Sequence, residues 1–198
     1  MKSTIILVIS VLSFSLLVRS QDFKTDITNA KQSYSSGKLE EAHFALMQAM
    51  QEIDIKVGQE ILKLLPAKMD TMNANVKEDR VAASSGFLGT TISRSYGVSR
   101  SGDLSIISNS PMVSTLNTFL NTPMLGGMMS DGNTKIIKVQ GYKGRMTKED
   151  NGDGKTGYTL EIPLSNALIT FKVSNCTDTQ MLAMANTLPL QQVAKLIQ

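Results

Sequence analysis

The sequence is short of the residues that most often form cross-links and catalytic sites: it has one cysteine, one histidine and no tryptophan in 198 residues. Because Cys176 has no second cysteine to pair with, the fold must be stabilised by packing, and we expect this thiol to be a small buried apolar group. The single histidine, His43, excludes sites with two histidine ligands and Ser-His-Asp catalysis built around another histidine, while Ser-Lys and carboxylate mechanisms stay open. We expect His43 to be half-buried on a helix.

Aromatic residues and net charge are also scarce. Aromatic residues make up 5% of the chain, and the formal net charge of +3 would fall to +1 without residues 1–20, which contain Lys2 and Arg19. A nearly neutral chain with few aromatic rings is not suited to bind a phosphate backbone or to stack on bases. Gly126-Gly127 also lacks the strand and helix that flank a phosphate-binding loop. We therefore expect no nucleic-acid partner and no cofactor.

Only the N-terminus carries a long apolar run. Residues 4–18 are uncharged, Lys2 precedes them, and Val18-Arg19-Ser20 follows. This pattern predicts a secretory signal peptide, residues 1–20, cleaved after Ser20, so the mature protein would be periplasmic or secreted with no stable membrane span. An uncleaved anchor is the alternative, although the run is shorter than the roughly 20 residues that span a bilayer. A lipid anchor would need a cysteine directly after the run.

Residues 21–68 predict a helical hairpin. Apolar residues recur every three or four positions in the second helix, a break falls at Ser35-Ser36-Gly37, and Pro66 ends the pattern. The pair resembles one tetratricopeptide unit, but such repeats need about three units to bury a continuous core. Two interpretations stay open: the pair packs against its own sheet, or it forms a docking groove for a partner. In the second case Tyr34, Leu39 and Phe44 are the candidate partner-binding residues.

Residues 69–198 predict a sheet with covering helices. Four strands follow one another between residues 134 and 173, separated by Gln140-Gly141, residues 150–154 and Ser165-Asn166, and two more are expected over residues 91–98 and 103–108. Helices are predicted from Ser110-Pro111 to Leu120 and over residues 179–197, the latter after a capping box at Thr177 and Gln180. Residues 69–83 are expected to be a connector. The fold class is therefore α+β, with the hairpin and a mainly antiparallel sheet of about six strands forming one compact unit.

Two segments suggest weak metal sites. Glu149, Asn151 and Asp153 occupy alternate positions of an acidic turn that resembles a calcium loop, but the twelfth position is Leu160 instead of glutamate, so a solvated hairpin turn is favoured. Met124, Met128 and Met129 cluster in a glycine-rich loop, and thioethers are suited to Cu(I). Ordinary packing of methionine explains them more simply.

Three fragments mimic penicillin-recognising enzymes: Ser35-Ser36-Gly37-Lys38, Ser130-Asp131-Gly132 and Lys155-Thr156-Gly157. That chemistry needs the nucleophilic serine at a helix start, one turn before its lysine. Here the first fragment falls in a turn between helices, so we do not assign this activity.

Five landmarks occur in order: Leu65-Pro66-Ala67-Lys68, the strand over residues 93–96, Asn109-Ser110-Pro111-Met112, Pro123-Met124 and Gly141-Tyr142-Lys143. From residue 65 onward they resemble an uncharacterised group of small exported bacterial proteins, although the tryptophan that those relatives carry after the Leu-Pro pair is absent. The resemblance implies an envelope or secreted location and supplies no activity. The order of elements also resembles the α/β sandwich of photosystem-accessory and Mog1-type proteins.

These observations favour an exported, non-catalytic protein that binds an envelope component or a small ligand in an accessory role. Its expected partner is another envelope protein. The alternatives are an enzyme of unrecognised type and a weak calcium- or copper-binding protein.

Overall fold

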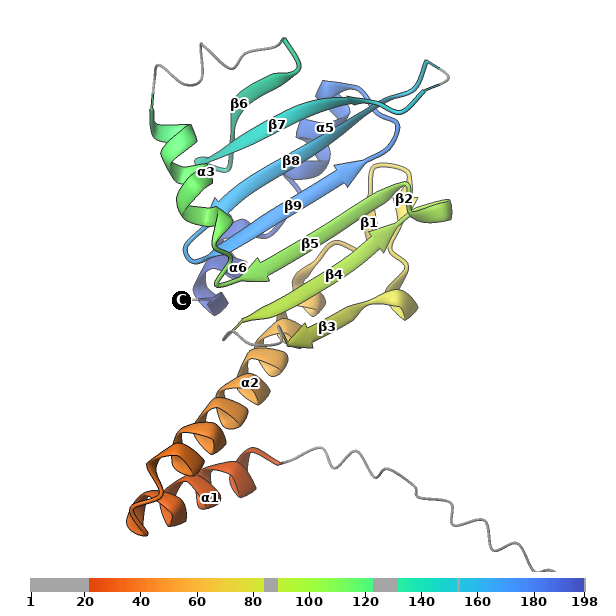
Figure 1. The fold of residues 1–198 in the computed structure, drawn as a ribbon. Helices are drawn as coiled ribbons and strands as arrows, with labels where there is room; N and C mark the ends of the chain where they lie inside the picture. Colours follow the sequence, from red (N-terminus) through yellow and green to blue (C-terminus); the bar gives the residue numbers. More distant parts are fainter. Residues whose placement is uncertain (1–21, 84–88, 123–131, 153, 198) are drawn as a thin grey trace, which may run out of the picture.

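The structure, a computed structural model, describes residues 22–83, 89–122, 132–152 and 154–197. In these residues a helical hairpin precedes a twisted antiparallel sheet that has helices on both faces (Figure 1). The predicted α+β class is confirmed. No helix among the described residues is long and apolar enough to cross a membrane.

The hairpin consists of α1 (Phe23–Ser35) and α2 (Leu39–Leu64). Gly37 links them with a φ of +72°, a conformation that glycine adopts without strain. The C-terminal half of α2 packs against β3, β4 and α6 (elements defined below), whereas among the described residues its N-terminal half packs against α1. Gly58 permits this close approach, because a Cβ there would lie 2.6 Å from Val81. The N-terminal half of α2 and all of α1 project from the sheet (Figure 1).

The main sheet has seven strands: β3 (Arg80–Ala83), β4 (Thr90–Tyr96), β5 (Gly102–Ser108), β6 (Thr134–Val139), β7 (Tyr142–Asp150), β8 (Thr156–Leu164) and β9 (Ala167–Val173). Their order is β3-β4-β5-β9-β8-β7-β6, and every neighbouring pair is antiparallel. The last strand in sequence, β9, lies in the middle, so it joins the hairpin β4–β5 to the meander β6–β8.

The six strands expected from the sequence are confirmed as β4 to β9. The prediction missed β3 and the small ribbon of β1 (Lys68–Met69) and β2 (Met72–Asn73), all within the expected connector. The 3-10 turns η1 (Val76–Glu78) and η2 (Val98–Arg100) flank β3 and β4. These pieces are too short to show a periodic apolar pattern, so only tertiary pairing reveals them.

Three helices and the end of α2 cover the sheet. On one face α5 (Asp178–Ala185), α6 (Leu190–Ile197) and the end of α2 enclose the main core, into which the cross-strand row Ile92, Ile106, Ile169 and Ile162 points. On the other face α3 (Met112–Asn121) packs Leu116 and Leu120 on Leu168. Figure 1 shows α3 in front of the sheet and α5 and α6 behind it. The predicted capping box at Thr177 and Gln180 starts α5.

A buried polar cluster fixes the end of α2 to the sheet. Arg94, 6% exposed, forms a two-pronged ion pair with Asp79 and donates to the Leu65 carbonyl at 3.1 Å. The Tyr96 hydroxyl donates to the Pro66 carbonyl at 3.0 Å. The bond to Asp79 raises the pKa of the Arg94 guanidinium, and burial raises the pKa of Tyr96 to about 12. The Leu65-Pro66 landmark is therefore an anchor of the fold.

Candidate docking surface on the helical hairpin

The two helices of the hairpin pack through small side chains. Ala30 of α1 and Ala42, Ala45 and Ala49 of α2 are buried along the contact line, and among the described elements α1 makes extensive contacts with α2 alone. Alanine lets two helix backbones approach closely and favours helix formation. The hairpin is therefore held together by a narrow seam, and the larger side chains of both helices lie beside that seam.

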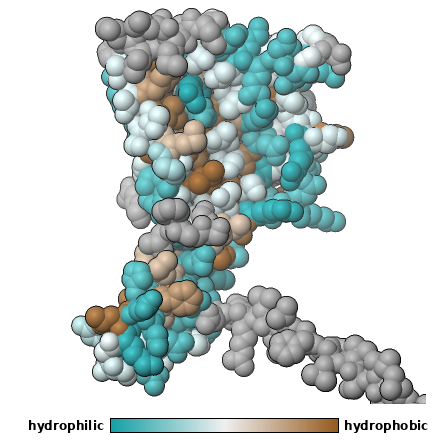
Figure 2. Space-filling view, in the orientation of Figure 1, coloured by the Kyte–Doolittle hydropathy of each residue, from teal (hydrophilic) through white to brown (hydrophobic). Residues whose placement is uncertain are grey.

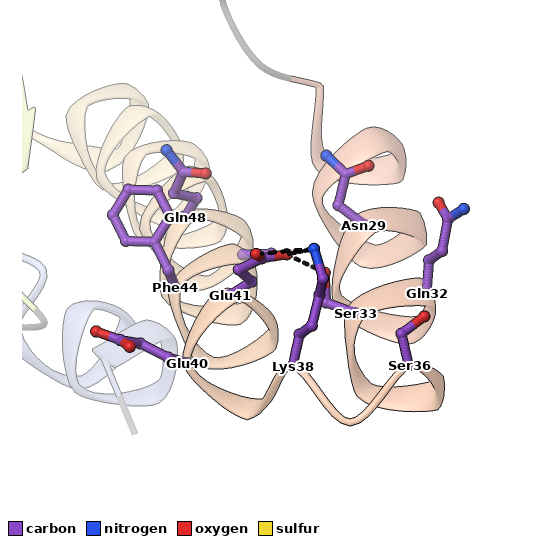
Figure 3. Close-up of a pocket in the computed structure, with 10 residues that line it drawn as sticks. Asn29, Gln32, Ser33, Ser36, Lys38, Glu40, Glu41, Phe44 and Gln48 are labelled. Carbon is purple, nitrogen blue, oxygen red and sulfur yellow. Dashed lines mark hydrogen bonds and ion pairs between the residues drawn. The ribbon is translucent and has the colours of Figure 1, made fainter.

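One side of the seam is a polar groove. A helix turns about 100° per residue, so the residues directly before the buried ones, such as Asn29, Phe44 and Gln48, point to the same side. They line a hollow of about 750 Å³ together with Glu41 and Lys38. Figure 3 shows these side chains on both helices, with the Lys38 ammonium 3.1 Å from the Glu41 carboxylate.

The other side is apolar. Residues that directly follow buried positions, such as Ile27, Leu46 and Met50, point away from the polar groove and none of them lines it. We call this side the apolar face and define it by seven side chains that are 39–69% exposed: Phe23, Ile27, Tyr34, Leu39, Leu46, Met50 and Ile53. Figure 2 shows hydrophobic residues among hydrophilic ones on the projecting hairpin.

The apolar face continues a stripe that is buried further along α2. Val57 and Ile61 follow Met50 and Ile53 at helical spacing and pack against the main core. The stripe is therefore covered by the sheet only in its C-terminal half. The expectation that the hairpin packs against its own sheet holds for that half, whereas the N-terminal half has no cover among the described residues.

The structure separates the three residues predicted to bind a partner. Tyr34 and Leu39 lie beside the turn on the apolar face, and both are exposed. Phe44 is exposed as well, but it lines the polar groove on the opposite side (Figure 3). Sequence reasoning missed Phe23, Ile27 and Met50. The spacing of Phe23, Ile27 and Tyr34 was the available signal, since it is that of one helical face.

A buried carboxylate lies in the seam. Asp26 is 0% exposed, and neither of its oxygens has a hydrogen-bond partner among the described residues. It stands in the first turn of α1, where the helix dipole favours a negative charge. The burial of this aspartate was not predicted, because a charged residue in the first turn of a helix is ordinarily exposed.

The candidate calcium ligands are engaged elsewhere. Glu149 is 2.6 Å from the Lys172 ammonium and accepts from the Thr159 hydroxyl, and both contacts lower the pKa of its carboxyl. Asn151 donates its amide to the Ser174 carbonyl. Asp153, Met124, Met128 and Met129 lie outside the described residues. Within the described ranges no three His, Cys, Asp or Glu side chains are grouped closely enough to hold a metal ion.

The remaining candidate residues do not form a catalytic group. His43 is exposed, so the expectation of a half-buried side chain was wrong. It lies near the N-terminus of α2, in the half that projects from the sheet. Cys176 is half-buried, and burial raises its pKa to about 11, so the thiol stays protonated at neutral pH. Ser36 lies in the turn between α1 and α2, and Lys155 lies directly before β8, so the first and third penicillin-like fragments are far apart (Figure 1). Residues 130 and 131 of the second fragment lie outside the described residues.

Two of the hollows that adjoin the sheet lie against its helices. The one at the junction of α2, α6 and the sheet measures about 150 Å³, well below the roughly 300 Å³ at which ligand sites begin. The one beneath α3 measures about 490 Å³, and Leu116, Phe119 and Leu168 give it mainly apolar walls. Arg145 lies there between the Phe119 ring, 5.7 Å away, and the Glu161 carboxylate, 2.5 Å away.

Comparison with known proteins adds no relative: no family model matches this chain, and neither does any curated protein. The resemblance to small exported bacterial proteins thus stays a prediction.

Proposed function

We propose that this protein is an exported, non-catalytic binding protein that docks onto a protein component of the cell envelope through the apolar face of its helical hairpin. The export part of the proposal rests on the charge and apolar pattern of residues 1–20. The docking part rests on one observation, the uncovered apolar face.

The size of this face supports the proposal. With roughly 200 Å² per fully exposed large side chain, its seven side chains offer about 700 Å² of surface. The largest apolar patch on an ordinary monomer is about 300–600 Å² and is often functional. The face also projects from the sheet on a helix pair, where a partner has access to it (Figure 1).

The rest of the fold makes the face unusual. The apolar sides of α3, α5 and α6 are each covered by the sheet. A hairpin that served only to complete the core would end where α2 leaves the sheet, near Val57. The additional turns of α2, and all of α1, bury little beyond their own alanine seam, so their apolar side chains need another explanation.

The test compares two substitutions on the same helix. The exported protein is immobilised, and proteins retained from envelope extract are compared for the wild type, Leu46→Glu and Phe44→Glu. Both residues are exposed, but only Leu46 lies on the apolar face. We expect Leu46→Glu to abolish retention of a specific protein and Phe44→Glu to preserve it. Equal effects of the two variants would contradict the proposal.

The hollow beneath α3 favours a second function, the binding of a small amphipathic ligand. Its volume lies within the 300–1,000 Å³ typical of ligand sites, and its apolar walls carry one charged pair, as such sites often do. Titration with small aromatic carboxylates such as benzoate, followed by methyl NMR signals of Leu116 and Leu168, tests this. Unchanged signals at millimolar ligand would exclude binding of that class.

A further inference from the structure

We infer that the hollow beneath α3 binds a free α-amino acid with a large apolar side chain, such as phenylalanine or leucine, through the paired charges of Arg145 and Glu161. This inference rests on the second function proposed above, since it names the ligand of the same hollow.

The hollow lies where α3 crosses the sheet. α3 contacts β7, β8 and β9 (Figure 1) and packs Leu116 on Leu168. Met112 and Phe119, from the same helix, extend this apolar wall around a volume of about 490 Å³. Such a volume lies toward the lower end of the range for small-molecule sites, so it suits a small ligand with one apolar group.

The sheet supplies two opposite charges to this hollow. Arg145 on β7 and Glu161 on β8 are directly opposite each other in the strand register, so their side chains project on the same face of the sheet. Both side chains line the hollow. The Phe119 ring lies 5.7 Å from the guanidinium carbon of Arg145, a cation–π contact that helps to hold this side chain in place.

The ion pair leaves hydrogen-bonding capacity unused. Arg145 donates from Nε to Oε2 of Glu161 at 2.7 Å, and its Nη2 lies 2.5 Å from the same oxygen. No hydrogen bond within the described residues engages Nη1 of Arg145 or Oε1 of Glu161. A ligand in the hollow would therefore find cationic donors and an anionic acceptor next to each other.

Stability alone does not account for this pair. The Arg145 side chain is 32% exposed and that of Glu161 only 12%, so both charges are partly removed from water. Replacing a buried ion pair by apolar residues of similar volume is often neutral or stabilising. A few convergent polar groups in an apolar hollow are instead what fixes the orientation of a bound ligand.

The signs of the two charges select the class of ligand. A carboxylate alone would approach the like charge of Glu161, and an amine alone would approach the like charge of Arg145. An α-amino acid carries both groups on one carbon, so its carboxylate can accept from Arg145 while its ammonium donates to Glu161. The termini of a peptide are separated by up to about 3.3–3.6 Å per residue, which is too far apart to meet two side chains that contact each other.

The test compares ligands that differ in one charge. The methyl NMR signals of Leu116 and Leu168 are followed while the exported protein is titrated with phenylalanine, 3-phenylpropionate, 2-phenylethylamine or glycine. We expect phenylalanine to shift both signals at millimolar concentration. The two singly charged analogues should bind about ten-fold or more weakly, because each loses one charge-assisted hydrogen bond. Glycine, which has no side chain to contact the apolar wall, should leave the signals unchanged.

Two substitutions test the assigned roles. Glu161→Gln should reverse the preference, so that 3-phenylpropionate binds at least as tightly as phenylalanine, because Arg145 then lacks its counter-ion. Glu149→Gln is the matched control: it removes a glutamate from another ion pair of the same sheet, with Lys172, and Glu149 does not line the hollow. It should leave the preference for phenylalanine unchanged. Circular dichroism confirms that both variants are folded.

Each outcome has one meaning. The inference is overturned if either singly charged analogue binds the wild type as tightly as phenylalanine, or if Glu161→Gln keeps the preference for phenylalanine. In both cases the hollow still takes small amphipathic ligands, so the second function stands. If none of the aromatic ligands shifts the two signals at up to about 10 mM, a concentration that detects even millimolar affinity, the inference and the second function both fail.

Discussion

Replacing Asp26 by alanine should stabilise the hairpin, although it removes a charged residue from a favourable position at a helix start. The Asp26 carboxylate is fully buried in the seam, and within the part of the chain that the structure describes neither oxygen has a hydrogen-bond partner. Leaving a buried polar group unsatisfied costs about 1–3 kcal/mol, and more for a charged one. Alanine removes that cost and matches the other side chains of the seam.

The competing terms are smaller. Alanine gains about 0.5 kcal/mol of helix propensity over aspartate, while the lost interaction with the helix dipole is worth about 0.3–1 kcal/mol. The net expectation is a gain of about 1–3 kcal/mol, which corresponds to a rise in Tm of roughly 2–12 °C if the hairpin melts with the sheet.

The assay is thermal unfolding followed by circular dichroism, with amide hydrogen exchange of α1 as a local measure. Asp22→Ala is the matched control, because Asp22 is an exposed aspartate at the start of the same helix whose side chain makes no capping bond. It should change stability by less than about 0.5 kcal/mol. A Tm for Asp26→Ala below that of the wild type, or faster exchange in α1, would refute the reasoning that this carboxylate is unsatisfied.

Three further predictions concern the sheet. Asp79→Ala should lower the free energy of unfolding by about 3–5 kcal/mol in urea titrations, because it leaves the Arg94 guanidinium buried without its counter-ion; a loss below about 1 kcal/mol would mean that Arg94 is solvated. The lowered pKa of Glu149 stabilises the fold above the ordinary value of 4.5, and this contribution is lost as the pH falls through the lowered pKa. The Tm difference between wild type and Glu149→Gln should therefore shrink from pH 6 to pH 2, and a constant difference would contradict the pairing with Lys172. Cys176 should react with iodoacetamide at pH 8 more slowly than free cysteine, because burial raises its pKa to about 11, and urea should restore the rate; equal rates in both conditions would show an exposed thiol.

The sheet was predictable from the sequence where apolar and polar side chains alternate along its strands. Residues 134–173 switch between apolar and polar side chains and are separated by turns, and the structure has all four strands there. The short strand β3 carries no such signal. Its four residues pair with β4, and α2 packs on them where Gly58 allows. Its existence depends on contacts with residues far away in sequence, which no local pattern encodes.

Only one part of the candidate site, the apolar stripe of the helix, was predictable from the sequence; the point at which the sheet stops covering it was not. The helical stripe through Leu46, Ile53 and Val57 is visible in the sequence, but periodicity cannot say where along a helix the cover ends. That point is set by the length of α2 relative to the sheet. Tyr34 and Leu39 were therefore found as exposed residues, whereas Phe44 was grouped with them although the helix turn carries it to the opposite side.

The continuous stripe of α2 links docking to stability. The residues Val57 and Ile61 are buried by the sheet, and Met50 and Ile53 continue the same face into solvent. A partner bound to the exposed half of α2 would also stabilise the half that is packed on the sheet, since helix formation is cooperative along the chain. Binding should therefore stabilise the end of α2 and, through the Arg94 contact to the Leu65 carbonyl, strand β4 next to the edge of the sheet. A helix that ended at the sheet could not transmit such an effect, which gives a physical reason for α2 to extend beyond the core.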